Sequence, residues 1–266
     1  MISAIAHHYL AVNRLYAGLS ERGIADAVPA AQVELETDFA KALTEPLEAY
    51  YEAPFKRGYS GVPTKSQAAI EDWLTVQYEN NPQWASGLIT AMLPFLKDGI
   101  AQGITQGLEL LHGPDTSIEL TNETLLADIA DHVSDLMAID ADISLAQTTI
   151  QDLARTIVRA VASDVILSVA LAALAGHILA RSILIAETEI SRSVTIGLVE
   201  TYGRNGIVHM LYNTRDSDAC KRCTPDNGKQ FIIPPAIWLP RHPHCRCFFT
   251  PNTSNWNPPI EWWVGA

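Results

Sequence analysis

Apolar residues recur every three or four positions through most of the first 200 residues, which is the spacing of one buried face of an α-helix. The clearest short segments with this pattern are residues 2–19, 30–51, 66–78, 84–111 and 121–138. A nearly continuous helical pattern then covers residues 142–201. That pattern is too long for one straight helix in a compact domain, and we expect a break near Gly176 or Ser182.

Prolines, glycines and capping residues predict where these helices end. Pro46 predicts a kink or boundary, and residues 56–64, with two glycines and a proline, predict a loop. Ser66 can cap the next helix, and residues 80–83 (Asn-Asn-Pro-Gln) predict its end. Pro94 and four glycines predict that the following helix is irregular.

The pattern changes after residue 206. Short strands are predicted at residues 207–213, 229–233 and 245–250, and Asn227-Gly228 before the second is a hairpin signal. The predicted fold class is therefore mainly α, with a helical body and a small C-terminal β (α+β) module.

Charge is distributed unevenly over the chain, whose formal net charge is −12. Seven Lys and Arg against four Asp and Glu give residues 201–266 a net charge of +3, which leaves −15 for residues 1–200. A surface with such a negative charge repels free nucleic acid and favours a solvated face or a basic protein partner.

Residues 165–180 contain no charged side chain, but sixteen residues fall short of the ~20 that span a bilayer. Asp164, His177 and Arg181 bracket or interrupt this stretch. We therefore predict a buried central helix and no stable membrane insertion.

The four cysteines of the chain all lie close together, at Cys220, Cys223, Cys245 and Cys247. Thiolates bind Zn²⁺ at about 2.3 Å, and a Cys-x2-Cys turn supplies two ligands at once. Cys245 and Cys247 would share one side of an extended strand. His242 is a spare ligand at turn spacing, and we place Cys247 ahead of it for the fourth position. The prediction is a structural Zn²⁺ site.

Other readings of these residues remain open. His244 ranks last as a ligand, because it would point away from the face that carries Cys245 and Cys247. Two disulfides would suit an oxidising compartment, for which residues 1–8 offer neither a basic start nor a signal-like apolar run. A redox Cys-x2-Cys usually follows a strand in a βαβ unit, which the pattern lacks. Unrelated buried thiols are the remaining alternative.

These observations divide the chain into three parts. Residues 1–204 form an acidic helical body, residues 205–251 a zinc-binding β module, and residues 252–266 a tail rich in Pro, Asn and Trp. A module this small gains much of its stability from its metal.

An ordered set of short motifs also runs through residues 180–251. Its members are Ile-Ala-Glu-Thr-Glu-Ile at 185–190, Tyr-x-Thr…Asp…Cys-x2-Cys at 212–223, Gly-x2-Phe at 228–231 and His-Pro-His-Cys-Arg-Cys at 242–247. In this order they resemble motifs of the head-morphogenesis, or minor head protein, family of tailed bacteriophages, the group related to protein F of phage Mu. The chain departs from the family pattern at Tyr212 (usually Trp), Glu187 (usually Arg) and His244 (usually Asn).

The resemblance implies a low-copy virion protein, associated with the portal or the inner capsid, that assists head morphogenesis and DNA ejection. Its partners would be portal and capsid proteins, with several copies per virion. It would reside in the phage head, and in the host cytoplasm during assembly. The resemblance covers residues 180–251 only.

A zinc-dependent nuclease is an alternative function. A catalytic zinc keeps an open position beside three protein ligands and a general base, whereas at least four ligands are available here. The His-x-Glu of zinc deaminases is missing, because His209 is followed by Met210 and Leu211. Glu187 and Glu189 are expected on a solvated helix face. The sequence thus predicts a protein that is not an enzyme.

A nucleic-acid-binding zinc module is a further alternative. Basic residues surround the cysteines, at Lys221, Arg222, Arg241 and Arg246. Trp238, Phe248 and Phe249 lie among them and could stack on bases, although aromatic rings in a module this small are more often its core. A weak contact between this module and DNA phosphate is the most that the charge allows.

Overall fold

The computed structural model describes residues 28–61, 66–81, 83–112, 149–159, 167–214, 221–235 and 239–252. It is mainly helical, with a small C-terminal sheet, and this confirms the predicted fold class. The helices predicted at residues 2–19 and 121–138, together with Cys220, Trp238 and nearly all of the tail, lie outside the described residues.

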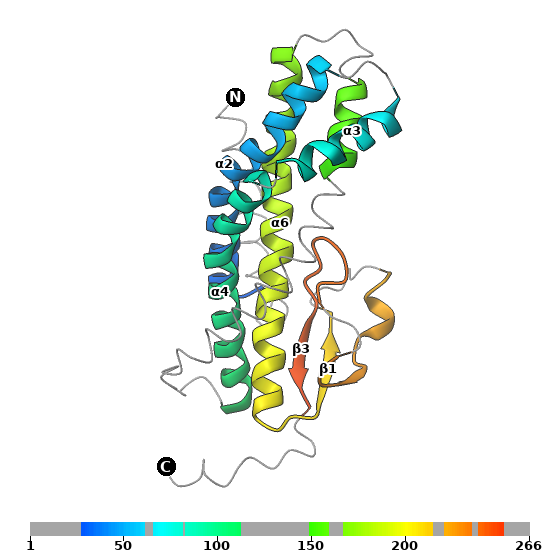
Figure 1. Cartoon of the computed structure of the whole chain (residues 1–266). Helices are drawn as coiled ribbons and strands as arrows, with labels where there is room; N and C mark the ends of the chain where they lie inside the picture. Colours follow the sequence, from blue (N-terminus) through cyan, green and yellow to red (C-terminus); the bar gives the residue numbers. More distant parts are fainter. Residues whose placement is uncertain are drawn as a thin grey trace.

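The long helices pack side by side. They are α2 (Ala30–Gly61), α4 (Gln83–His112) and α6 (Leu167–Arg204), with the shorter α3 (Gln67–Glu79) packed on α2 and residues 149–159 also helical. Figure 1 shows α2 and α4 along one side of α6, and the sheet beside the C-terminal half of α6 on the other side. Because α6 is covered on both sides, buried residues occupy most of its circumference there.

The prediction of a break in the long helical pattern near Gly176 or Ser182 is wrong. α6 is one helix of 38 residues, about 57 Å long. Ser182 is fully buried, and its hydroxyl donates a hydrogen bond to the Leu179 carbonyl within the helix. Gly176 lies on the exposed side. Neither residue interrupts α6, because α2, α4 and the sheet pack against this helix along its length.

The predicted loop at residues 56–64 is wrong up to residue 61, because α2 continues to Gly61 and includes both Pro46 and Pro54. Phe55 is fully buried in the core, so packing maintains the helix beyond the second proline. The helix expected after Ser66 is confirmed, with Ser66 at the N-cap position and Asn80 at the C-cap, although the Ser66 side chain makes no capping hydrogen bond.

The glycines of α4 do not make it irregular. Gly99, Gly103 and Gly107 recur every four residues on the face that meets α6. A Cβ on Gly103 would lie 2.1 Å from the Val194 carbonyl oxygen, and one on Gly197 would lie 2.3 Å from that of Ile100. The two backbones are therefore in direct contact, which only glycine permits at this pair of positions.

Within α6, the apolar stretch near residue 170 is only partly buried. Leu174 and Ile178 are buried, whereas Val169 is 54% exposed. Among the helices that the structure describes, none is long and apolar enough to cross a membrane.

The sheet has the order β2-β1-β3, and both pairings are antiparallel. Its strands are β1 (His209–Asn213), β2 (Gln230–Ile232) and β3 (Phe248–Pro251). The third strand was predicted to begin at Cys245, but β3 begins only at Phe248, after the cysteines. Tyr212 pairs with Phe249 and is fully buried beside it.

Asn227 and Gly228 form a turn but not a two-residue hairpin, because β1 and β2 are separated by residues 214–229. Asn227 has φ −59° and ψ 127°, Gly228 has φ 77°, and the Lys229 amide donates to the Asp226 carbonyl at 3.0 Å. These values describe a type II turn, whose third residue requires a positive φ.

The helices and the module share one hydrophobic cluster. Tyr202 near the end of α6, Tyr212 in β1 and Phe249 in β3 are all fully buried in it. The Tyr202 hydroxyl donates a hydrogen bond to the Phe249 carbonyl at 3.2 Å. The module thus packs against the C-terminal end of α6 and is hydrogen-bonded to it.

Candidate metal centre

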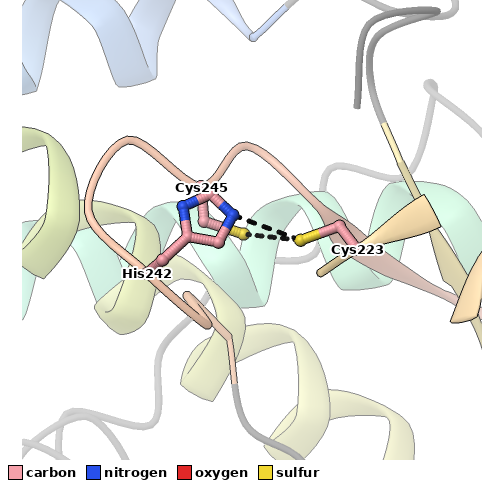
Figure 2. A group of neighbouring side chains, drawn as sticks. All are labelled: Cys223, His242 and Cys245. Carbon is pink, nitrogen blue, oxygen red and sulfur yellow. Dashed lines mark hydrogen bonds between the residues drawn. The ribbon is translucent and has the colours of Figure 1, made fainter. Parts of the chain in front are cut away.

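Two cysteines and a histidine converge at one end of the module. Cys223 Sγ lies 3.2 Å from His242 Nε2 and 3.9 Å from Cys245 Sγ. The three ligand atoms are all within 4.8 Å of one another. Figure 2 shows His242 and Cys245 on one loop, facing Cys223 from the other. Ligands about 2.0–2.3 Å from a tetrahedral ion have this spacing, so the cluster could hold a metal ion.

Two short turns position the ligands. Cys223 directly precedes the 3₁₀ turn η1 (Thr224–Asp226), where the Asp226 amide donates to the Cys223 carbonyl at 3.0 Å. On the facing loop, the Cys245 amide donates to the His242 carbonyl at 3.1 Å. The first turn therefore positions Cys223, and the second positions His242 and Cys245 opposite it.

The His242 ring is oriented for metal binding. Its Nδ1 lies 2.7 Å from the Pro243 carbonyl oxygen. Because a carbonyl only accepts, Nδ1 carries the proton and Nε2 presents its lone pair toward Cys223. Metal-binding histidines are commonly held in one tautomer by such a bond.

Cys247 lies beside this cluster but is not one of its three mutually close ligands. Its thiol donates to Cys245, which lowers the pKa of Cys245 despite burial. That hydrogen bond and burial raise the pKa of Cys247. His242 therefore belongs to the group of three close ligand atoms, and Cys247 lies next to that group, near the thiols of Cys245 and Cys223.

Burial isolates the two cysteine ligands from water, whereas His242 is partly exposed. Cys223 is 1% exposed and Cys245 is 3% exposed. The Tyr212 hydroxyl lies beside the thiols of Cys223 and Cys247, and burial raises the pKa of this hydroxyl. Tyr212 is the residue that stands where the resembling family usually has Trp, so that position packs against the thiols.

Asp226 joins the two ligand-bearing loops. Its carboxylate accepts a hydrogen bond from Lys229 Nζ at 2.8 Å and forms an ion pair with Arg241. These hydrogen bonds lower the pKa of Asp226. The Arg241 guanidinium also lies over the Tyr212 ring, 6.0 Å from its centroid.

His244 turns away from the ligands, as its low rank predicted, and contacts the carboxylate of Glu187 through Nδ1. It follows Pro243 in the turn and has φ 60°, the left-handed region that Gly and Asn prefer at this position of a type II turn. The turn therefore restricts which amino acids position 244 accepts, because the residue there must adopt a positive φ.

Replacement of His244 by Val is expected to destabilise the protein by about 1–2 kcal/mol more than replacement by Asn, because a β-branched residue is strained at positive φ. Both variants lose the imidazole contact with Glu187, so their difference isolates the backbone effect. Denaturant unfolding of the two metal-loaded variants measures it. Equal stabilities would show that residue 244 has an ordinary negative φ.

Arg246, between Cys245 and Cys247, is largely buried, with 11% of its side chain exposed. Its guanidinium makes a two-pronged contact with Glu36, in which Nη2 lies 2.9 Å from Oε2. Nη2 also lies 3.3 Å from Glu187 Oε1. Burial raises the pKa of Glu36, and the charge of Arg246 opposes that shift.

The prediction that Glu187 and Glu189 lie on a solvated helix face is wrong. Both are buried, because this part of α6 lies between α2 and the module. Glu187 meets Arg246 and His244, and Glu189 pairs with Arg192 at 3.1 Å. The positions of Glu187 and Glu189 in the helical pattern could not predict this burial, because Arg246 and His244 lie far away in the sequence.

Cys220, the remaining predicted ligand, lies outside the described residues, as do Asp216 and Asp218. No family model, curated protein or solved structure matches this chain.

Proposed function

We propose that this chain is a non-enzymatic minor head protein of a tailed bacteriophage, associated with the portal or the inner capsid, and that a structural zinc ion stabilises its C-terminal module. One observation carries the proposal. The motifs that resemble that family are far apart in the sequence, yet residues 185–190 and 242–247 meet in space through Glu187, His244 and Arg246. Glu187 and His244 are departures from the family pattern, so the support for a common origin comes from the order of the motifs and from their proximity in the fold, not from these particular contacts.

Zinc is the ion that suits the ligands best. Two thiols and one imidazole, at Cys223, Cys245 and His242, form a soft to borderline set that excludes Mg²⁺ and Ca²⁺ as preferred ions. Cys220 or Cys247 would complete a closed tetrahedral shell, which is typical of structural rather than catalytic zinc.

The surroundings of the site give the nuclease alternative little support. Asp226, a candidate general base, is engaged by Lys229 and Arg241, and His244 is engaged by Glu187. A water activated by the metal would also need access, whereas both cysteine ligands are almost completely buried.

A contact with DNA would be weak. Arg246 and Arg241 are used in ion pairs within the protein, whereas Lys221 and Arg222 are exposed. On a chain of net charge −12, Lys221 and Arg222 can add only a small salt-dependent attraction to phosphate. The proposed partners are therefore portal and capsid proteins, in the phage head and, during assembly, in the host cytoplasm.

The proposal predicts that the chain is a component of the virion. In a tailed phage that encodes it, quantitative mass spectrometry of gradient-purified particles is expected to find several copies per virion, far fewer than the major capsid protein. Removing the chain is expected to yield defective heads or particles that fail to deliver DNA. A chain abundant in the lysate but absent from purified virions would contradict the proposal.

A further inference from the structure

We infer that Arg246 is a positioning residue through which the metal site and the helices α2 and α6 stabilise one another. The inference rests on the metal site of the proposed function, but not on the role in the phage head. It assigns a part in metal binding to Glu36, a residue of α2 that is not a ligand and lies 210 positions before Arg246.

The first step is the place of Arg246 in the chain. It directly follows Cys245, whose thiol is in the ligand cluster. Cys245 is also fixed by the turn from His242. An ion bound to His242 and Cys245 therefore fixes the backbone from which the Arg246 side chain extends.

The second step is the site that receives the guanidinium. Glu36 is 5% exposed, and both of its oxygens face Arg246. Gln32 Nε2 donates to Glu36 Oε1 at 3.0 Å and to Ser191 Oγ at 3.3 Å. Arg246 Nη1 also lies 3.4 Å from Ser191 Oγ. A planar two-pronged pair in a hydrogen-bonded, buried setting accepts the guanidinium in one orientation only.

The third step is the charge balance. Glu36 and Glu187 bring two carboxylates into the interior, and the guanidinium of Arg246 contacts both. Without it, Glu36 would lose its cation in the interior and face the nearby carboxylate of Glu187, whose other partner is His244, and this is strongly unfavourable. The helices thus depend on the loop that the metal orders.

Thermodynamic linkage makes this dependence reciprocal. If metal binding favours the docked position of Arg246, the docked position raises metal affinity by the same factor. A change at Glu36 should therefore weaken metal binding while leaving the ligands themselves unchanged.

The test compares Glu36→Gln with Glu34→Gln in the full-length protein. Both remove one carboxylate from α2, but Glu34 is exposed and forms the matched control. Zinc affinity is measured by competition with a chromophoric chelator. Loss of an outer partner of a metal site typically costs 10–100-fold in affinity, and we expect this loss for Glu36→Gln and no change for Glu34→Gln.

Cobalt substitution separates positioning from coordination. The absorption spectrum of bound Co²⁺ reports the set of sulfur and nitrogen ligands, and it is expected to be the same in Glu36→Gln as in the wild type. Should Glu36→Gln fail to fold, Ser191→Ala removes the hydroxyl that accepts from Arg246 and from Gln32, and it is expected to weaken zinc binding about fivefold.

The outcomes are distinct. Wild-type zinc affinity in folded Glu36→Gln, or in Ser191→Ala where that variant replaces it, would overturn the inference, as would a changed Co²⁺ spectrum. A wild-type protein that binds no metal would instead overturn the zinc site of the proposed function. Weaker zinc binding with an unchanged spectrum supports the inference.

Discussion

Replacing Gly197 by Ala is expected to lower the free energy of unfolding by about 3 kcal/mol, even though alanine is the better helix former. The added methyl carbon would lie 2.3 Å from the Ile100 carbonyl oxygen and 3.0 Å from the Cα of Gly103. Both neighbours are backbone atoms, so no side chain can rotate to make room. α4 and α6 would have to separate along their glycine contact.

Gly176→Ala provides the control on the same helix. A Cβ at Gly176 meets nothing within 4 Å, so the change should stabilise the protein by about 0.5–1 kcal/mol through helix propensity alone. Denaturant unfolding followed by circular dichroism at 222 nm measures both variants. Equal stabilities for the two would show that α4 and α6 do not pack backbone against backbone.

Replacing Cys223 by Ser, or removing the metal with a chelator, is expected to have an effect of similar size. Cys223 is the ligand that lies within 4 Å of both His242 and Cys245. An ion present at about a thousand times its dissociation constant stabilises the folded state by about 4 kcal/mol. Its loss should lower the melting temperature by about 10 °C in a chain of this size.

The structure changes the expected extent of unfolding when a cysteine ligand is lost. The sequence alone predicts that loss of a cysteine such as Cys220 unfolds the region beyond about residue 205 and leaves the helices intact. Because Tyr202 and Phe249 belong to one core, we expect helicity to persist at 25 °C but to melt earlier. Cys247→Ser, which alters a thiol outside the three-ligand group, should lower the melting temperature less than Cys223→Ser. A Cys223→Ser variant that melts like the wild type would contradict the metal assignment.

Local patterns predicted much of the fold. The helix after Ser66, α4 and the three strands follow from apolar spacing and capping residues, which act over a few residues. The unbroken α6 could not be predicted in this way, since its continuity depends on α2, α4 and the sheet covering it along its length.

In the candidate site, too, some features could be predicted from local spacing and others could not. The spacing of Cys223, His242 and Cys245 marked them as ligands because a metal needs several ligands from short turns. The pairing of Arg246 with Glu36 could not be predicted, because it joins residues 210 positions apart. A buried acid on a helix looks in the sequence like any solvated one until its partner is known.

The most direct test of the zinc site is the metal content of the purified full-length chain, with titration of its thiols before and after a chelator. One zinc per chain is expected, with cysteines that react only once the zinc is removed. A metal-free protein whose thiols react at once, or are already oxidised, would contradict the zinc site.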